Sequence, residues 1–345
     1  MKNTKLFVPE KTLFRDESVF EPGYVPETVL YRDAELQTLS SCMTPALRGG
    51  RPTNVLIQGN PATGKTTAIK YVFEQMRDYS SKIVPVHVNC RVSSTPYKIL
   101  SEIHKRLFGY APPDTGVPKA RIYEKICTSL AKERKSLVLA LDDMNYLLLS
   151  RDADEVLSSI LRASEVFSGV RTCIWATTHT GVMHQLDTKN RSLFQPEQIQ
   201  FKNYSADQIS QILAARASVG LADGVASQAL IKIIAGQSSD VRQALEILRQ
   251  SVLKAEQEGS PRVEQRHIHM QTLVPELDER ESLILQTVRN GSTEAGTIYD
   301  QCCTTQQMSY STFYRTLQKL KAMQLLDIQQ VGKQQGRTST VTLRQ

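Results

Sequence analysis

The sequence has no long hydrophobic run. Its longest unbroken aliphatic stretches, such as residues 137–141, are far shorter than the roughly 20 residues that a membrane-spanning helix needs. Near the start, the apolar residues 6–8 end at Pro9, which is too short for the apolar core of a signal peptide. We therefore expect neither a transmembrane nor a secreted protein, and we expect a cytoplasmic location.

The sequence also lacks cysteine- and histidine-based metal-binding motifs and redox motifs. Its six cysteines include no C-x-x-C pair and lie mostly in apolar surroundings, which predicts buried, reduced thiols. His267 and His269 are close together without partner ligands, so we expect both on a helix surface and no metal site there. The length of 345 residues, with 40% hydrophobic and 22% charged residues, indicates two or three globular domains.

The sequence does contain a phosphate-binding loop. Residues 59–66 read Gly-Asn-Pro-Ala-Thr-Gly-Lys-Thr and fit G-x-x-x-x-G-K-[ST] at every fixed position. A short apolar run at residues 54–57 precedes the loop, and apolar residues at helical spacing follow it. The loop therefore joins a buried strand to a helix, so that its N–H groups and the helix N-terminus point at phosphate. The alternative is a chance match in a surface loop.

Each residue type in the loop has a chemical reason. Gly64 lets the backbone come close to phosphate oxygens, Lys65 reaches the β- and γ-phosphates, and the Thr66 hydroxyl ligates Mg²⁺. The loop thus predicts ATP or ADP, with Mg²⁺, as the cofactors. Its predicted nucleotide-binding residues are Asn60, Pro61, Ala62, Thr63, Gly64, Lys65, Thr66 and Thr67.

Acidic residues end the predicted strand at residues 137–141. Asp142 is placed to hold a magnesium-bound water together with Thr66, and Asp143 to polarise an attacking water. The alternative is a strand that ends in a solvated turn. Further strands at residues 83–88 and 172–176 alternate with helices, and Pro85 in the first of them suggests a strand end or an edge position. This alternation predicts an α/β fold with a parallel sheet and with ligands at the carboxyl ends of its strands.

The pattern becomes purely helical after Phe194. Ser205 and Gln208 form a capping box in front of a helix that stops at Gly220. Arg242 lies in the first turn of a later helix, where the helix dipole disfavours a cation. Either Asp240 offsets this cost locally, or Arg242 points at an anion elsewhere.

The last seventy or so residues read as a winged helix-turn-helix. Helices at residues 279–289, 294–301 and 309–323 precede two strands at 326–331 and 338–343, which are joined by a basic connection. In the third helix, Phe313, Leu317 and Leu320 mark the core face. Winged modules also bind proteins, and a basic face is often only solvated. We favour double-stranded DNA as the partner, and the predicted contacts are Ser311, Arg315, Gln318, Lys319, Lys333 and Arg337.

Taken together, the motifs resemble the archaeal replication initiators related to the origin recognition complex and the cell-division-cycle loader ATPases. The similarity includes the phosphate loop, the strand before Asp142, the lid start at residues 200–216 and the helix opened by residues 240–245. It implies an AAA+ P-loop NTPase α/β domain with a parallel sheet at residues 1–200. It further implies a helical lid at 201–274, a winged-helix DNA-binding domain at 275–345, and a DNA-touching insertion between residues 94 and 121.

The resemblance also implies roles for single residues. Val25, Pro26 and Arg32 would line the opening of the adenine pocket, and Tyr204 and Arg216 of the lid would contact the nucleotide. Arg242 would approach the γ-phosphate, which favours the anion over the local explanation. The residues implied in catalysis are Asp142, Asp143, Thr178 and Arg242.

The sequence departs from the family pattern at several of these positions. Asp143 stands where the family usually has glutamate, Thr178 where it has asparagine, and Ser239 where it has glycine. Arg191 is the nearest candidate for an arginine finger. A shorter carboxylate lies further from the attacking water, so we predict ATP binding with slow hydrolysis.

The resulting hypothesis is an ATP-binding DNA replication initiator that recognises and remodels origin DNA and helps to load the replicative helicase. Paralogous initiators would be further partners. An ATP-gated winged-helix transcription regulator is the alternative, because it needs the same switch and the same DNA reader. A remodelling ATPase whose winged helix binds protein is a third possibility.

Overall fold

The computed structural model describes residues 12–113, 115–150, 152–179, 186–268, 278–289, 291, 293–322, 325–333 and 336–343. The chain forms two compact units, Met1–His269 and Met270–Gln345, and we treat each by itself. Within the described ranges, no helix has the length and apolar character that crossing a membrane requires.

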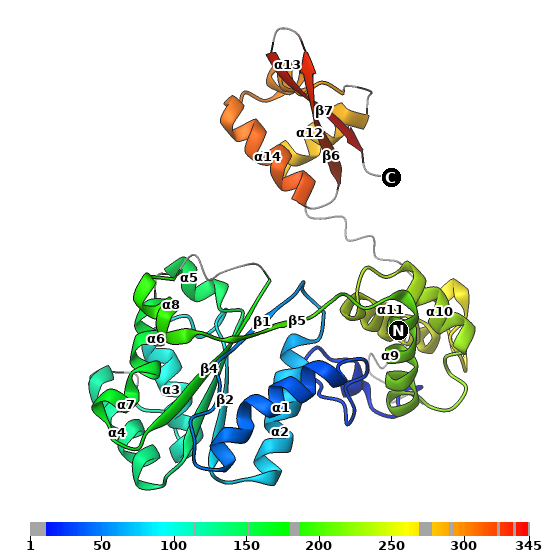
Figure 1. Cartoon of the computed structure of the whole chain (residues 1–345). Coiled ribbons are helices and arrows are strands. Elements are labelled where there is room, and N and C mark those ends of the chain that lie inside the picture. The colour runs from blue at the N-terminus through cyan, green and yellow to red at the C-terminus, as the bar shows by residue number, and fades with distance from the viewer. Residues whose placement is uncertain are drawn as a thin grey trace, which may run out of the picture. The chain divides into compact units, whose positions relative to one another are not determined.

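The larger unit contains a five-stranded sheet (Figure 1). Its strand order is β2-β3-β4-β1-β5, and every pairing is parallel, so the carboxyl ends of all five strands lie at one edge. The predicted parallel α/β sheet is confirmed, and β2, which carries Pro85, is an edge strand as predicted. The strands are β1 (Val55–Gln58), β2 (Ile83–Asn89), β3 (Ser136–Asp142), β4 (Arg171–Thr178) and β5 (Glu197–Gln200).

The strand β5 was not predicted. The sequence pattern after Phe194 reads as purely helical, which is wrong for residues 197–200. Ile199 is buried, but the other three side chains of β5 are exposed, so neither an apolar run nor an alternation marks it as a strand. Its place is set by backbone pairing along β1.

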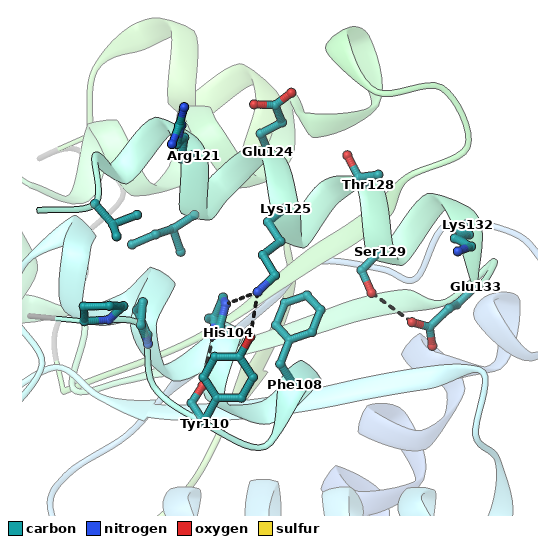
Figure 2. A pocket seen from close by; sticks show the side chains of 14 residues that line it. His104, Phe108, Tyr110, Arg121, Glu124, Lys125, Thr128, Ser129, Lys132 and Glu133 are labelled. Atoms are coloured by element: carbon teal, nitrogen blue, oxygen red, sulfur yellow. Dashed lines mark hydrogen bonds between the residues drawn. The ribbon is translucent and has the colours of Figure 1, made fainter.

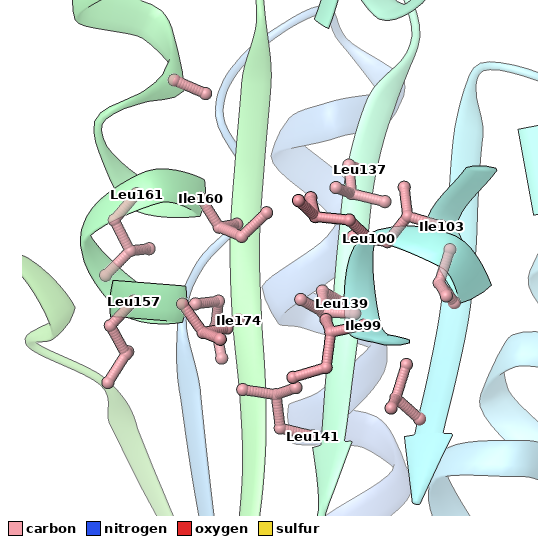
Figure 3. Packing of buried hydrophobic residues seen from close by; sticks show 14 of the residues in the cluster. Ile99, Leu100, Ile103, Leu137, Leu139, Leu141, Leu157, Ile160, Leu161 and Ile174 are labelled. Carbon is pink, nitrogen blue, oxygen red and sulfur yellow. The ribbon is translucent and has the colours of Figure 1, made fainter. Parts of the chain in front are cut away.

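Alternate side chains of β3 supply the two cores of the sheet. Leu137, Leu139 and Leu141 face one side, where they pack with α3 and α6 (Figure 3). Val138 and Ala140 face the other side and pack with α1 and α2. Both faces are therefore buried, as an apolar parallel strand requires. The helices around the sheet are α1 (Asp33–Leu47), α2 (Lys65–Tyr79), α3 (Pro96–Phe108), α4 (Lys119–Lys132), α5 (Asn145–Ser150), α6 (Ala153–Leu161), α7 (Ala163–Val166) and α8 (Thr188–Phe194).

Three helices after β5 form the lid of the same unit. The predicted capping box of Ser205 and Gln208 is present at the start of α9, which ends at Gly220 as predicted. The amino-terminal segment packs into this helical core through Phe14 and Phe20, and the Arg15 N–H donates to the Gly220 carbonyl at 2.8 Å. The lid elements are α9 (Ala206–Gly220), α10 (Gln228–Gln237), α11 (Val241–Gln257) and the 3₁₀ helix η3 (Gln265–His267), while the 3₁₀ helix η1 (Glu17–Phe20) belongs to the amino-terminal segment.

His267 is not on a helix surface as predicted. Its side chain is buried: Nδ1 accepts from the Glu264 N–H at 2.9 Å, and Nε2 lies 3.1 Å from a Glu258 carboxylate oxygen. The helix expected around His267 is only the single turn η3 in the described part of the chain. His269 lies outside the described residues.

The cysteines are buried, as predicted, except for the partly exposed Cys303. Burial is the main reason that the pKa of Cys90 rises to about 12. A thiol with so high a pKa stays protonated and unreactive at neutral pH.

The smaller unit is a three-helix core with a two-stranded antiparallel sheet. An isolated bridge joins Glu294 to Thr340 beside this hairpin, and the Val341 N–H donates to the Thr293 carbonyl at 2.7 Å. The arrangement is the predicted winged helix, with strands longer than predicted. Its elements are α12 (Glu279–Arg289), α13 (Ala295–Thr305), α14 (Tyr310–Ala322), β6 (Leu326–Lys333) and β7 (Gly336–Leu343).

Candidate nucleotide-binding site and DNA-binding face

The phosphate loop at residues 59–66 lies between β1 and α2, at the carboxyl edge of the sheet. Its two glycines have positive φ, 156° at Gly59 and 90° at Gly64. A Cβ at Gly59 would lie 2.4 Å from the carbonyl oxygen of Phe201, and one at Gly64 would lie 2.8 Å from the hydroxyl of Tyr204. Both positions therefore exclude a side chain, because the segment after β5 packs directly on the loop.

The ammonium group of Lys65 is hydrogen-bonded to two backbone carbonyls at the start of the same loop. Its Nζ donates to the carbonyl oxygens of Gly59 at 2.8 Å and Asn60 at 2.7 Å. Burial lowers the pKa of Lys65, while the charges of Asp143 and Asp142 raise it. A phosphate oxygen would compete with the two carbonyls for the same donors, and the contact of Lys65 with phosphate stays a prediction.

Other loop residues hold the loop's shape. The Thr63 hydroxyl donates to the Asn60 carbonyl at 2.8 Å, and the Asn60 amide donates to the side chain of Asn203 at 3.1 Å. Ala62 has φ of 60°. Pro61 is exposed and Thr67 is half-buried at the start of α2.

Asp142 is the centre of a buried polar cluster. Its Oδ2 accepts from the Thr66 hydroxyl at 2.8 Å and lies 3.1 Å from Nε2 of His87, and its Oδ1 accepts from the Thr177 hydroxyl at 2.7 Å. Burial raises the pKa of Asp142, but hydrogen bonds from His87, Thr177 and Thr66 outweigh it and hold the pKa below its usual value. The carboxylate is therefore ionised at neutral pH. It lies beside the hydroxyl of Thr66, with which it is predicted to hold Mg²⁺.

The neighbouring Asp143 has a different environment. It adopts φ of 57°, and its carboxylate is 42% exposed. An Oδ2 oxygen lies 3.8 Å from Nε of Arg91, whose guanidinium also donates to the Tyr146 hydroxyl at 2.7 Å. The predicted water-polarising carboxylate is thus solvated and beside a cation.

Two polar residues of this cluster, His87 and Thr177, were missed by sequence reasoning. Both lie near the carboxyl ends of strands that flank β3, which is the signal that identifies them in hindsight. The Thr177 hydroxyl also accepts from the Asp143 N–H at 2.8 Å. Thr178, which the resemblance implies in catalysis, is buried at the end of β4, where its carbonyl accepts from the Gly59 N–H at 3.2 Å.

Arg32, predicted at the opening of the adenine pocket, is buried against the phosphate loop. Its guanidinium donates twice to the Thr63 carbonyl, at 3.1 and 3.0 Å, and once to the Lys202 carbonyl at 2.6 Å. Val25 and Pro26 are half-buried in the preceding segment.

The two predicted nucleotide contacts of the lid face different neighbours. Tyr204 packs on Gly64, and burial raises its pKa. Arg216 donates to the Val19 carbonyl at 3.1 Å and lies over the ring of Tyr24, with 4.3 Å to the centroid. Tyr204 is therefore in contact with the phosphate loop, and Arg216 with the amino-terminal segment.

Arg242 lies in the first turn of α11 and is exposed. Asp240 caps this helix by accepting from the Gln243 N–H at 2.9 Å. Besides burial, the charge of Arg242 contributes to lowering the pKa of Lys65. The approach of Arg242 to the γ-phosphate stays a prediction.

Arg191, the candidate arginine finger, is exposed on α8. Its guanidinium donates to the Leu186 carbonyl at 3.1 Å.

The third helix of the winged unit, α14, presents the predicted DNA-binding face. Phe313, Leu317 and Leu320 are buried in the core as predicted. On the other side of the helix, Ser311, Arg315, Gln318 and Lys319 are exposed.

One of these residues has a partner that the sequence did not predict. Lys319 forms an ion pair with Glu281 of α12, whose side chain is only 1% exposed, and this contact raises the pKa of Lys319. Lys333 and Arg337 lie in β6 and β7, and their side chains lie outside the described residues.

A wide pocket of about 810 Å³ lies between α3 and α4, in the region where the DNA-touching insertion is predicted. Figure 2 shows Lys125 pointing at His104 and Tyr110 beside the ring of Phe108. Nδ1 of His104 lies 2.9 Å from the Tyr110 carbonyl, so it carries the proton, and Nε2 accepts from Lys125 at 3.2 Å. These contacts tie the connection after α3 to α4.

Comparison with known proteins places these observations in a family. Residues 28–174 match the AAA ATPase domain family, and residues 210–271 match the Cdc6 AAA+ ATPase-type lid domain family. ORC1-type DNA replication protein 2 of Methanothermobacter thermautotrophicus is 37% identical over 344 residues, which cover 95% of this chain and 91% of that protein. ORC1-type DNA replication protein 3 of Haloarcula marismortui is 31% identical over 353 residues, which cover 97% and 94%.

Solved structures show the same fold. The Aeropyrum pernix ORC1 protein, solved in complex with DNA, matches with a TM-score of 0.72 at 25% identity, over 97% of this chain and 94% of that one. The Aeropyrum pernix ORC2 protein, solved as ADPNP and ADP complexes, matches with a TM-score of 0.67 at 22% identity, over 96% and 94%. This chain therefore belongs to the archaeal ORC1/Cdc6 family of DNA replication proteins.

Proposed function

We propose that this protein is an ATP-binding replication initiator that recognises and remodels origin DNA. The observation that carries the proposal is the convergence of Lys65, Thr66 and Asp142 at the carboxyl edge of the sheet, with Tyr204 of the expected lid packed on Gly64 of the same loop. A nucleoside triphosphate bound there would contact both the sheet and the lid. Its presence would therefore favour one angle between them.

The residues at this edge fit Mg²⁺. The Thr66 hydroxyl and the Asp142 carboxylate are 2.8 Å apart, and hard oxygen ligands of this kind are those that Mg²⁺ prefers. Thr66 would ligate the ion directly and Asp142 through water. When bound, Mg²⁺ would neutralise charge on the β- and γ-phosphates.

We propose that ATP acts here as a conformational signal and is hydrolysed slowly. Asp143 is short, solvated and beside Arg91, all of which weaken its action on an attacking water. Thr178 and Arg242 would act as the sensors of the γ-phosphate. Tyr204 and Arg216 would complete the site from the lid, with Val25 and Pro26 at the adenine.

The winged unit supplies the DNA-reading surface of this proposal. Arg315 and Lys319 carry positive charge on the exposed face of α14, and Gln318 offers an amide that pairs with adenine in the major groove. Lys333 and Arg337 of the hairpin would add phosphate contacts. The expected three-domain division, 1–200, 201–274 and 275–345, assigns the switch to the first two domains and the reader to the third. Helicase loading and assembly with paralogous initiators would follow DNA binding.

Footprinting of the purified full-length chain tests the proposal. We expect binding to duplexes from AT-rich repeat clusters to be at least about 100-fold tighter than to random duplexes at physiological salt, with ATP present. Equal affinity for both would contradict sequence-specific initiation. Selective protection of promoters, with no preference for the repeats, would identify the transcription regulator instead.

A further inference from the structure

Arg32 is a buried cation at the start of α1, and its contacts join two segments far apart in the sequence. We infer that Arg32 is a positioning residue that locks the phosphate loop to the segment leading into the lid, so that the two change conformation together. The inference deepens the proposed ATP switch and depends on it for its biological meaning. It assigns to Arg32 a role other than contact with the nucleotide.

The guanidinium has no donor left for a nucleotide. Nε and Nη2 donate to the Thr63 carbonyl at 3.1 and 3.0 Å, and Nη2 donates also to the Lys202 carbonyl at 2.6 Å. Nη1 donates to the Glu35 carboxylate at 3.2 Å and the Tyr31 carbonyl at 3.4 Å. An arginine has five N–H donors, and these contacts use all five. The side chain is 5% exposed, so water does not replace any of them.

Aromatic rings fix the plane of the same guanidinium. Its central carbon lies 4.0 Å from the ring centroid of Tyr204 and 5.2 Å from that of Phe201. Both rings belong to the segment between β5 and α9, residues 201–205, which we call the lid connection. A planar, weakly hydrated cation suits this stacked position, and a lysine ammonium would not reproduce it.

The lid connection also packs directly on the loop. Phe201 and Tyr204 occupy the space that a Cβ at Gly59 or Gly64 would need. The side chains of Asn60 and Asn203 add a hydrogen bond at 3.1 Å. These contacts join the loop directly to the lid connection, and Arg32 contacts both segments, so neither segment moves without breaking several contacts.

This arrangement couples nucleotide binding to the lid. A phosphate that draws Lys65 from the Gly59 and Asn60 carbonyls would change the peptide groups of the loop. Arg32 holds the Thr63 carbonyl of that loop and the Lys202 carbonyl of the lid connection on adjacent donors. A change in the loop would therefore reach α9 through Arg32.

Hydrogen exchange on the full-length chain tests this inference, with and without ATP and Mg²⁺. The variants are Arg32→Lys and a matched control, Arg51→Lys, whose guanidinium donates to the Thr172 carbonyl near the start of β4. Without nucleotide, we expect residues 59–64 and 201–205 of Arg32→Lys to exchange about 10-fold faster than in the wild type. Exchange in β3 should be unchanged. With ATP, we expect the loop, α9 and α11 of the wild type to gain protection from exchange. In Arg32→Lys, we expect the loop to gain protection but α9 and α11 not to.

Several outcomes would overturn the inference. Unchanged exchange in both segments, or a change in the loop alone, would show that Arg32 does not join them. A 100-fold loss of ATP affinity with unchanged exchange would make Arg32 a direct nucleotide contact. If Arg32→Lys loosens β3 as well, Glu35→Ala, which removes one acceptor of the guanidinium only, must speed exchange in the same two segments about threefold. A wild-type chain that fails to bind ATP would refute the proposed switch, while exchange without nucleotide still decides the role of Arg32.

Discussion

The nucleotide site and the exposed face of α14 are built in opposite ways. Around Asp142, three side chains donate to one buried carboxylate, and each is held by a different strand or helix. On α14, Ser311, Arg315 and Gln318 project from a single helix whose other side forms the core. Substitutions at the first region therefore change stability together with binding, whereas substitutions at the second change binding alone.

Asp142→Asn should have the largest effect. The amide keeps one oxygen and puts an NH₂ donor in place of the other, so it cannot accept from Thr66, Thr177 and His87 together. We expect a loss of about 3 kcal/mol in the free energy of unfolding at pH 7. Urea denaturation measures it, with the exposed Asp207→Asn as the matched control. A loss equal to that of the control would show that the cluster does not stabilise the fold.

The same variant predicts a dependence on pH. Since the folded-state pKa of Asp142 lies below the unfolded value near 4, its stabilisation is complete above about pH 5. It is lost as the pH falls through the folded pKa. The difference between wild type and Asp142→Asn should therefore shrink on acidification from pH 5, and a constant difference would contradict the lowered pKa.

Lys65→Ala should weaken ATP binding by about 100-fold, or about 2.7 kcal/mol. The ammonium is the side-chain cation within the phosphate loop, and its removal also frees the Gly59 and Asn60 carbonyls. Calorimetric titration with ATP and Mg²⁺ measures the change, with the exposed Lys232→Ala of the lid as control. Unchanged affinity would refute the assignment of the loop.

The parts of this site that the sequence predicts are those with a local signal. Lys65, Thr66 and Asp142 belong to short motifs whose spacing predicts contact with phosphate and Mg²⁺. His87 and Thr177 carry no such pattern, because their partner Asp142 comes from another strand. The polar strand β5 was missed for the same reason, since only its pairing with β1 defines it.

The winged unit shows what can be predicted from helical periodicity and what cannot. Helical periodicity predicts which face of α14 is buried, and Phe313 and Leu317 confirm it. Periodicity does not predict what an exposed residue contacts. Lys319 appeared free for DNA, yet it pairs with Glu281 of a different helix.

Arg315→Ala should lower DNA affinity about 10-fold with no change in stability. Arg315 is exposed on α14, so its loss removes a phosphate or guanine contact without opening the core. A phosphate contact would also make the salt dependence of log affinity shallower by about 1. Fluorescence anisotropy over a range of salt concentrations measures both, with the exposed Arg280→Ala of α12 as control. Equal effects of the two variants would mean that α14 has no special role.

Asp143→Glu should raise the rate of ATP hydrolysis about fivefold. The longer side chain would extend its carboxylate by about one methylene toward an attacking water. Single-turnover hydrolysis measures the rate, and ATP affinity should stay within about twofold. An unchanged rate would show that the shortness of this carboxylate does not limit turnover.

Glu281→Gln should have the smallest effect. Glu281 combines features of the two regions compared above, the buried nucleotide site and the exposed face of α14. Glu281 is a buried carboxylate like Asp142, but its partner Lys319 belongs to the exposed face of α14. Without the ion pair, Lys319 is released toward DNA and one negative charge is lost, so we expect about threefold tighter binding. Anisotropy at fixed salt measures the change, with exposed Glu294→Gln as control. Weaker binding would mean that Glu281 holds Lys319 in its DNA-binding position, and the face of α14 would then depend on buried contacts as the nucleotide site does.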